Sequence, residues 1–180
     1  MNKNKFLIVI DMQNDFVYGP LSNPDTKAMV PAIKNKIKEA RKNGVSIIFT
    51  RDTHFTNYLK TLEGQYLPIE HCQMSSNGWN IINELPTNAA KIYDKPTFGD
   101  RFLAEELAEY YDISTEGYIE LCGVCTDICV ISNALMLRSF LPNITIKVDS
   151  NCCAGTTPEK HKAALEIMKS CQIEVINESK

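Results

Sequence analysis

Short apolar runs alternate with longer amphipathic segments along the chain. The runs are rich in valine and isoleucine and occupy residues 6–10, 45–50, 90–93, 118–122, 144–148 and 173–176. Short, continuous apolar runs are typical of strands that are buried on both faces of a sheet. The pattern therefore predicts six strands in a sheet that is covered on both sides.

The segments between these runs have the apolar spacing of amphipathic helices. We expect helices at residues 27–42, 100–110, 127–140 and 158–170. Asn43-Gly44 and Pro142 are stop signals, and Thr157 followed by Pro158 is a start signal. Alternating strands and helices predict an α/β fold with three αβα layers, in which helices cover both faces of a central, mostly parallel, six-stranded sheet of the Rossmann-like type.

Residues 53–86 interrupt this alternation. The segment is polar and aromatic in character and is long for a loop in a compact domain. Such a loop is usually functional or contains short helices of its own. Because the chain shows no internal repeat and no linker composition, we expect a single domain over residues 1–180, with an excursion at residues 53–86 that forms a metal site or a lid.

Composition and charge narrow the class of protein. The chain has 180 residues, of which 44% are hydrophobic and 23% charged, which suits one globular core. Its net charge of -3 provides no basic surface for nucleic acid or anionic lipid. The first apolar run is too short for a signal peptide and no run is long enough to span a membrane, so we expect a cytoplasmic protein. The seven cysteines are then expected to be reduced thiols, not a disulfide framework.

Four predicted strands are followed by side chains that can do chemistry. In chain order these are Asp11, then Asp52 with His54, then Lys95, then Cys129. In a parallel sheet the carboxyl ends of the strands meet at one edge, and the ligand crevice lies outside that edge. The sequence therefore predicts that these side chains meet at one edge of the sheet.

Cys129 is the candidate nucleophile of this site. Thr126 can cap the helix that carries Cys129, and the positive end of that helix, together with the Lys95 ammonium, favours a thiolate. Asp127 opposes this if its carboxylate points inward. Asp11, at the rim of the core, is expected to have a raised pKa that suits proton transfer. For Cys129 the alternative is a buried structural thiol, but the presence of Lys95 and Asp11 favours a nucleophile. For Asp11 the alternative is a capping or salt-bridging aspartate, which would lie in the same place.

Asp52, His54 and His71 form a second candidate site. A carboxylate and two imidazoles suit zinc, iron or manganese, and Glu63 could supply a fourth ligand. The alternative is a hydrogen-bonded surface cluster. The third histidine, His161, lies inside the last predicted helix and is expected to be solvated or structural. The cysteines at positions 122, 125 and 129 have no second pair with matching spacing, and the adjacent cysteines at 152 and 153 rarely chelate one ion, so neither group predicts a metal cluster.

Three motifs are similar to those of a known family. They are LIVIDMQNDF at residues 7–16, KPTFG at residues 95–99 and GVCTDICV at residues 123–130. In this order and spacing, the chain resembles the isochorismatase-like cysteine hydrolases, and within them the nicotinamidase branch. The resemblance covers essentially the whole chain and implies the isochorismatase-like fold.

The resemblance also implies the roles of individual residues. The catalytic residues would be Asp11, Lys95 and Cys129. The Val124-Cys125 peptide bond would be cis, and the backbone N–H groups of Cys125 and Cys129 would form an oxyanion hole.

RDTH at residues 51–54 and EHC at residues 70–72 resemble the metal-binding stretches of nicotinamidases. The implied ligands are Asp52, His54 and His71, and Phe16 would line the substrate pocket. One difference from nicotinamidases is Thr53, where they usually carry an aromatic residue.

The expected activity is hydrolysis of a small carboxamide, with nicotinamide as the first candidate, to an acid and ammonia through a thioester on Cys129. The expected cofactor is a divalent metal, zinc in the first place and iron or manganese otherwise. Two alternatives are a related hydrolase acting on a ureido or carbamoyl amide or on isochorismate, and a non-catalytic or redox-sensing binding module. The resemblance implies a homo-oligomer, and no nucleic-acid or membrane partner is expected.

Overall fold

The computed structural model describes residues 4–111 and 116–178. Its strands form one six-stranded sheet in the order β3-β2-β1-β4-β5-β6, and every neighbouring pair is parallel. The strands are β1 (Lys5–Ile10), β2 (Ser46–Asp52), β3 (Lys91–Lys95), β4 (Tyr118–Val124), β5 (Thr145–Ala154) and β6 (Glu174–Ile176). The predicted six-stranded parallel sheet is confirmed.

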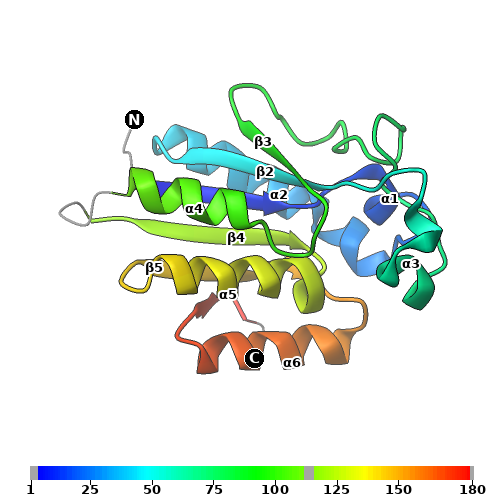
Figure 1. The fold of residues 1–180 in the computed structure, drawn as a ribbon. Coiled ribbons are helices and arrows are strands. Elements are labelled where there is room, and N and C mark those ends of the chain that lie inside the picture. Colours follow the sequence, from blue (N-terminus) through cyan, green and yellow to red (C-terminus); the bar gives the residue numbers. More distant parts are fainter. Residues whose placement is uncertain (1–3, 112–115, 179–180) are drawn as a thin grey trace.

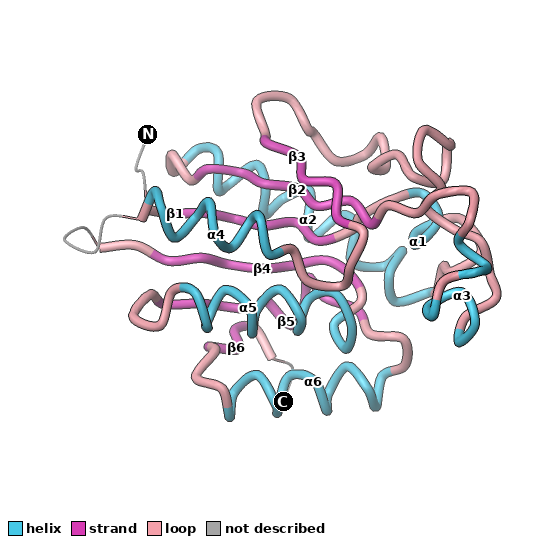
Figure 2. Tube along the Cα trace, viewed as in Figure 1, coloured by secondary structure: helices cyan, strands magenta, loops and turns pink. Residues whose placement is uncertain are grey.

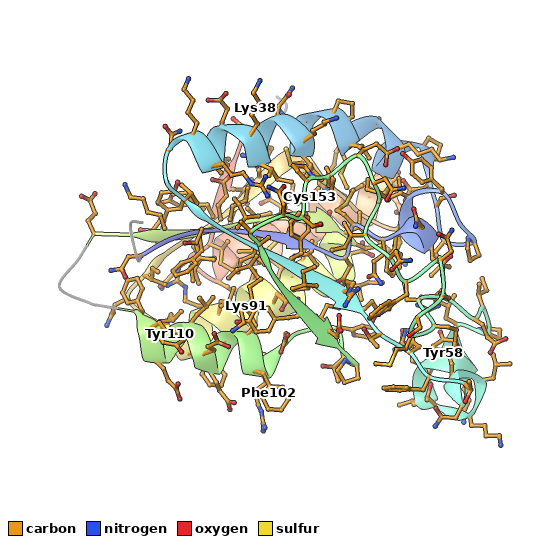
Figure 3. The ribbon with its side chains drawn as sticks, turned by 90° about the horizontal axis from the view of Figure 1, so that it is seen from above. Lys38, Tyr58, Lys91, Phe102, Tyr110 and Cys153 are labelled. Atoms are coloured by element: carbon orange, nitrogen blue, oxygen red, sulfur yellow. The ribbon has the colours of Figure 1, made fainter. Side chains whose placement is uncertain are left out.

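Helices cover both faces of this sheet (Figure 1). One face carries α2 (Pro24–Lys42), and the other carries α4 (Arg101–Tyr110), α5 (Ile131–Phe140) and α6 (Pro158–Ser170). Seen from above, Lys38 on α2 and Phe102 on α4 lie on opposite sides of the sheet (Figure 3). The predicted three-layer αβα architecture is confirmed. Among the described residues, no helix is long and apolar enough to cross a lipid bilayer.

Most element boundaries follow local signals in the sequence. Helix α6 begins as predicted, because the Thr157 side chain accepts a hydrogen bond from the Lys160 N–H. Helix α2 begins at Pro24 instead of residue 27, because Asn23 caps it and Pro24 suits the first helical position. Strand β5 continues to Ala154, beyond the predicted end at residue 148, through polar residues that interrupt the apolar pattern.

The excursion between β2 and β3 contains two short helices, as expected for so long a segment (Figure 2). They are the 3₁₀ helix η1 (Tyr58–Lys60) and α3 (Leu62–Tyr66). They lie at the same end of the molecule as α1 (Asn14–Val17), which follows β1 (Figure 1). All seven cysteines are free thiols, in agreement with the sequence-based expectation.

The centre of the sheet is β1, whose residues 7–10 are at most 1% exposed. Strand β4 approaches β1 so closely that a Cβ atom at Gly123, where φ is +120°, would lie 2.1 Å from the Ile10 carbonyl oxygen. From β1 the chain proceeds to β2 and β3 on one side, and β4 to β6 fill the other side. The strand order therefore reverses at β1 and β4. Such a switch point is where ligands bind in open α/β sheets.

Candidate active site

Asp11, Lys95 and Cys129 meet at the carboxyl end of the sheet. Asp11 directly follows β1, Lys95 ends β3, and Cys129 lies in the turn after β4. Lys95 Nζ is 2.6 Å from Asp11 Oδ2 and 3.5 Å from Cys129 Sγ. Their exposed fractions are 0%, 1% and 5%, in the order Asp11, Lys95, Cys129. The three residues thus form a compact acid–cation–thiol cluster shielded from bulk water.

Burial and charge set the protonation states of this cluster. Burial raises the pKa of Asp11, and the neighbouring Lys95 only partly offsets that effect. Burial acts against the charge on Lys95, but Asp11 and the other anionic groups nearby outweigh it and raise the pKa of Lys95 above its ordinary value. The thiol of Cys129 has a raised pKa because burial outweighs the attraction of Lys95. This raised pKa differs from the thiolate that the helix start and Lys95 led us to expect.

The start of the helix that carries Cys129 also differs from the prediction. Residues Thr126–Val130 form a π-helical turn, η2, before α5, and its first turn has no side-chain cap. The expected cap by Thr126 is wrong, because this buried hydroxyl lies 2.8 Å from His161 Nδ1 on α6. His161 is half-buried in this contact, which fits the structural role that was one of the two expected for it. The Asp127 carboxylate accepts hydrogen bonds from the Thr156 N–H and Oγ1, at 2.8 and 2.6 Å.

The chain before η2 has the conformation that the resemblance implied. The peptide bond between Val124 and Cys125 is cis. Cys125 lines the same cavity as Cys129. The role of the Cys125 and Cys129 backbone N–H groups as an oxyanion hole stays a prediction.

A second cluster lies beside the first. Asp52, His54, Glu63 and His71 each offer one ligand atom, and these atoms lie within 4.8 Å of one another. Asp52 Oδ2 is 2.9 Å from His54 Nε2 and 3.4 Å from His71 Nε2. Burial acts to raise the pKa of Asp52, but hydrogen bonds from the two imidazoles outweigh it and hold that pKa below its ordinary value. The cluster is connected to the first one, since Asp52 Oδ1 is 3.9 Å from Lys95 Nζ.

This donor set fits a divalent transition-metal ion. Two imidazole nitrogens and two carboxylates are ligands that zinc, iron and manganese accept. His71 Nδ1 lies 2.7 Å from the Ile69 carbonyl oxygen. A proton on Nδ1 would satisfy that contact and leave the Nε2 lone pair facing the cluster, which is the usual second contact of a metal-binding histidine.

A cavity of about 300 Å³ joins the two clusters. Cys125 and Cys129 line one part of it, and Asp52, Glu63 and His71 line another. The remaining wall is largely apolar and includes Phe16, Leu21, Leu67, Phe98 and Ile128. Phe16, which the resemblance implied for the substrate pocket, lines this cavity, and so do Leu67 and Phe98, which the sequence did not indicate. Leu67 follows α3 in the irregular excursion, where no periodic pattern indicates which side chains point inward.

Comparison with known proteins identifies the family of this chain. Residues 5–179 match the isochorismatase domain family. This chain belongs to the isochorismatase family. It is therefore a hydrolase of that family, and its similarity to characterised members extends over nearly its full length.

Three relatives illustrate this similarity. A nicotinamidase of Schizosaccharomyces pombe is 26% identical, over 99% of this chain and 95% of that protein. A protein of Arabidopsis thaliana named "probable inactive nicotinamidase" is 27% identical, over 93% of this chain and 89% of that protein. The crystal structure of the Pyrococcus horikoshii pyrazinamidase in complex with zinc superimposes with a TM-score of 0.80 at 27% identity, covering 96% of this chain and 98% of that one.

Proposed function

We propose that this chain is a cysteine amidohydrolase that converts a small aromatic carboxamide, nicotinamide in the first place, to the acid and ammonia. The observation that carries the proposal is the cavity of about 300 Å³, which has the Cys129 thiol in one wall and the metal-ligand cluster in another. This volume, at the lower end for ligand pockets, suits a substrate with a single ring. The names of the fungal and archaeal relatives support the substrate class.

The first chemical step uses the acid–cation–thiol cluster. Asp11 accepts the thiol proton of Cys129 as the sulfur attacks the amide carbon, and Lys95 stabilises the negative charge on both groups. Lys95 is well placed for this, since its Nζ is 2.6 Å from Asp11 Oδ2 and 3.5 Å from Cys129 Sγ. The backbone N–H groups of Cys125 and Cys129 are our candidates for stabilising the oxyanion.

The second step returns the proton and regenerates the thiol. Asp11 donates the proton that it received to the departing nitrogen, which leaves as ammonia, and a thioester remains on Cys129. Water then attacks the thioester with Asp11 as the base, which releases the acid and restores the thiol. Over one cycle, one amide and one water give one acid and one ammonia.

The second cluster would hold the metal. Asp52, His54 and His71 would be its ligands, with Glu63 as the fourth, and we propose zinc because the archaeal relative was crystallised with that ion. When bound, a zinc ion supplies a Lewis acid that can orient a heteroatom of the substrate or a water molecule. The buried Asp52 and His71 would orient the substrate from the wall of the cavity beside Cys129.

Ammonia release from nicotinamide, pyrazinamide and a ureido compound tests the proposal. We expect turnover of the aromatic amides by the wild type and its loss in Cys129→Ala, with an unchanged melting temperature. Cys171→Ala is the matched control, because Cys171 caps the far end of α6 and is half-buried. Undiminished turnover in Cys129→Ala rules the mechanism out. Turnover of the ureido compound alone would show that the substrate is a ureido amide and not an aromatic carboxamide. Binding of nicotinamide without ammonia release identifies a non-catalytic module, as the name of the Arabidopsis relative suggests for that protein.

A further inference from the structure

Gln13 is a fully buried residue of the LIVIDMQNDF motif whose side chain contacts the backbone of Asp52. Its Nε2 donates to the Asp52 carbonyl oxygen at 2.8 Å, and its Oε1 accepts from the Asp52 N–H at 2.7 Å. Nε2 also donates to the Trp79 carbonyl oxygen at 2.9 Å. A buried amide with its donors and acceptor used in this way is fully satisfied and holds its partners in one geometry.

These bonds replace a strand neighbour that Asp52 lacks. The pairing of β1 with β2 ends at Val9 and Phe49, because the chain turns at Asp11, where φ is +49°. On its other side Asp52 pairs with Lys95 of β3. The Gln13 amide therefore fixes the Asp52 backbone from the side that β1 leaves open.

Asp15, two residues further along, contacts the segment that carries His71. Its Oδ2 accepts a hydrogen bond from the Cys72 N–H at 2.7 Å. The space around this carboxylate is closely fitted, since a Cβ atom at Gly78 would lie 2.1 Å from Asp15 Oδ2 and one at Gly19 would lie 2.5 Å from Oδ1. Asp15 therefore fixes the backbone directly after His71.

We propose that Gln13 and Asp15 are positioning residues for the metal cluster, and this inference rests on the metal site of the proposed function. Asp52 ends a strand, whereas His71 belongs to the excursion, so nothing in the sheet itself fixes the distance between these two ligands. Gln13 holds the first and Asp15 holds the neighbour of the second, both from the short segment that follows β1. Partners that orient metal ligands typically change metal affinity by about 10- to 100-fold when they are removed.

Asn14 provides the control within the same segment. Its side chain donates to the Asn77 carbonyl oxygen at 2.8 Å, and its N–H donates to the Asn80 carbonyl oxygen at 2.9 Å. It therefore also attaches the excursion to the segment after β1, but at residues that do not neighbour a ligand. A merely structural role for the segment would make Asn14 as important for metal binding as Gln13 and Asp15.

The test measures zinc affinity of the full chain by competition with a chromogenic chelator, and the visible absorption of the cobalt(II)-loaded protein. We expect Gln13→Met and Asp15→Ala each to weaken zinc binding by about 10- to 100-fold and to change the cobalt spectrum. Asp15→Asn, which keeps an acceptor oxygen for the Cys72 N–H, should recover most of the affinity. Asn14→Ala should bind zinc as the wild type does.

Folded Gln13→Met and Asp15→Ala variants with wild-type affinity and spectrum overturn the inference and leave the metal site intact. An equal loss in Asn14→Ala also overturns it, because the effect would then be one of general loop attachment. If Gln13→Met does not fold, the zinc affinities of Asp15→Ala and Asp15→Asn decide whether the inference holds: it requires a loss in Asp15→Ala that Asp15→Asn largely restores. A wild-type chain without zinc affinity refutes the metal site of the proposed function and the inference together, whereas ammonia release tests the Cys129 chemistry separately.

Discussion

Replacing Lys95 by methionine should make the stability of the protein depend strongly on pH. Methionine has a similar length and no charge, so the variant leaves Asp11, which is 0% exposed, without the ammonium 2.6 Å from its Oδ2. Thr50 Oγ1, at 2.6 Å from Asp11 Oδ1, is a neutral donor and cannot replace that charge. Removing one partner of a buried ion pair costs about 3–5 kcal/mol when the other partner stays ionised.

The sign of the pH dependence follows from the carboxyl group that remains. Burial already raises the pKa of Asp11 above its ordinary value of 3.8, and loss of Lys95 raises it further. Above pH 3.8 the folded variant then binds more protons than the unfolded chain. The free energy of unfolding therefore falls as pH rises, by at most about 1.4 kcal/mol per pH unit for one proton. It becomes level once Asp11 is ionised in the folded state. The free energy of unfolding of the variant should therefore lie only slightly below that of the wild type in acid, and about 3–5 kcal/mol below it at higher pH.

Urea unfolding of both proteins from about pH 4 to pH 8 measures this difference. The double variant Asp11→Asn/Lys95→Met is the control, because it removes the buried carboxylate as well, and asparagine tolerates the positive φ of residue 11. We expect it to recover most of the stability at high pH. A deficit that does not change with pH, or no recovery in the double variant, would refute the assignment of a buried carboxylate that depends on Lys95.

Three further predictions follow from contacts in the structure. Gly123→Ala should cost roughly 3 kcal/mol of unfolding free energy, because its Cβ atom would meet the Ile10 carbonyl oxygen at 2.1 Å. Gly44→Ala, with φ of +69° and no atom within 4 Å of the new Cβ, should cost only about 1–2 kcal/mol. Equal losses of the two variants in urea unfolding would contradict this difference. Asp127→Ala should raise KM several-fold with little change in kcat, because Thr156, which lines the cavity, loses its two hydrogen bonds to the carboxylate. A loss confined to kcat in steady-state assays would argue that Asp127 does not act by holding Thr156 in the cavity wall. Zinc at a hundredfold excess over its Kd should stabilise the chain by about 2.7 kcal/mol and raise Tm by roughly 5–10 °C. If calorimetry gives the same Tm with zinc as with a chelator, the result speaks against the metal site.

The strands were predictable because a parallel sheet covered on both faces needs continuous apolar runs. The same rule explains the error in β5, whose continuation beyond residue 148 begins with Asp149, Ser150 and Asn151. Asp149 is buried there, and its carboxylate pairs with Lys36 of α2 at 2.6 Å. A polar residue satisfied by a distant partner looks like a loop residue in the sequence, so only the packing of α2 reveals that the strand continues.

The catalytic candidates were predictable from topology, because residues that follow parallel strands must share one edge of the sheet. The protonation state of Cys129 was not predictable, because the direction of its pKa shift depends on whether burial outweighs the charge on Lys95. The role of Thr126 depends likewise on His161, which lies 35 positions later in the sequence. Neither the depth of burial nor a distant partner can be read from local spacing.

The sequence by itself determined the fold class, the family resemblance and the residues that gather at the carboxyl end of the sheet. It could do so because apolar periodicity and motif order are local properties of the chain. Only the tertiary structure decided how the excursion at residues 53–86 places Glu63 and His71 beside Asp52, and which side chains hold them there. The hydrogen bonds of Gln13 and Asp15 cross 39 and 57 positions of sequence, and contacts of that range exist only once the chain has folded.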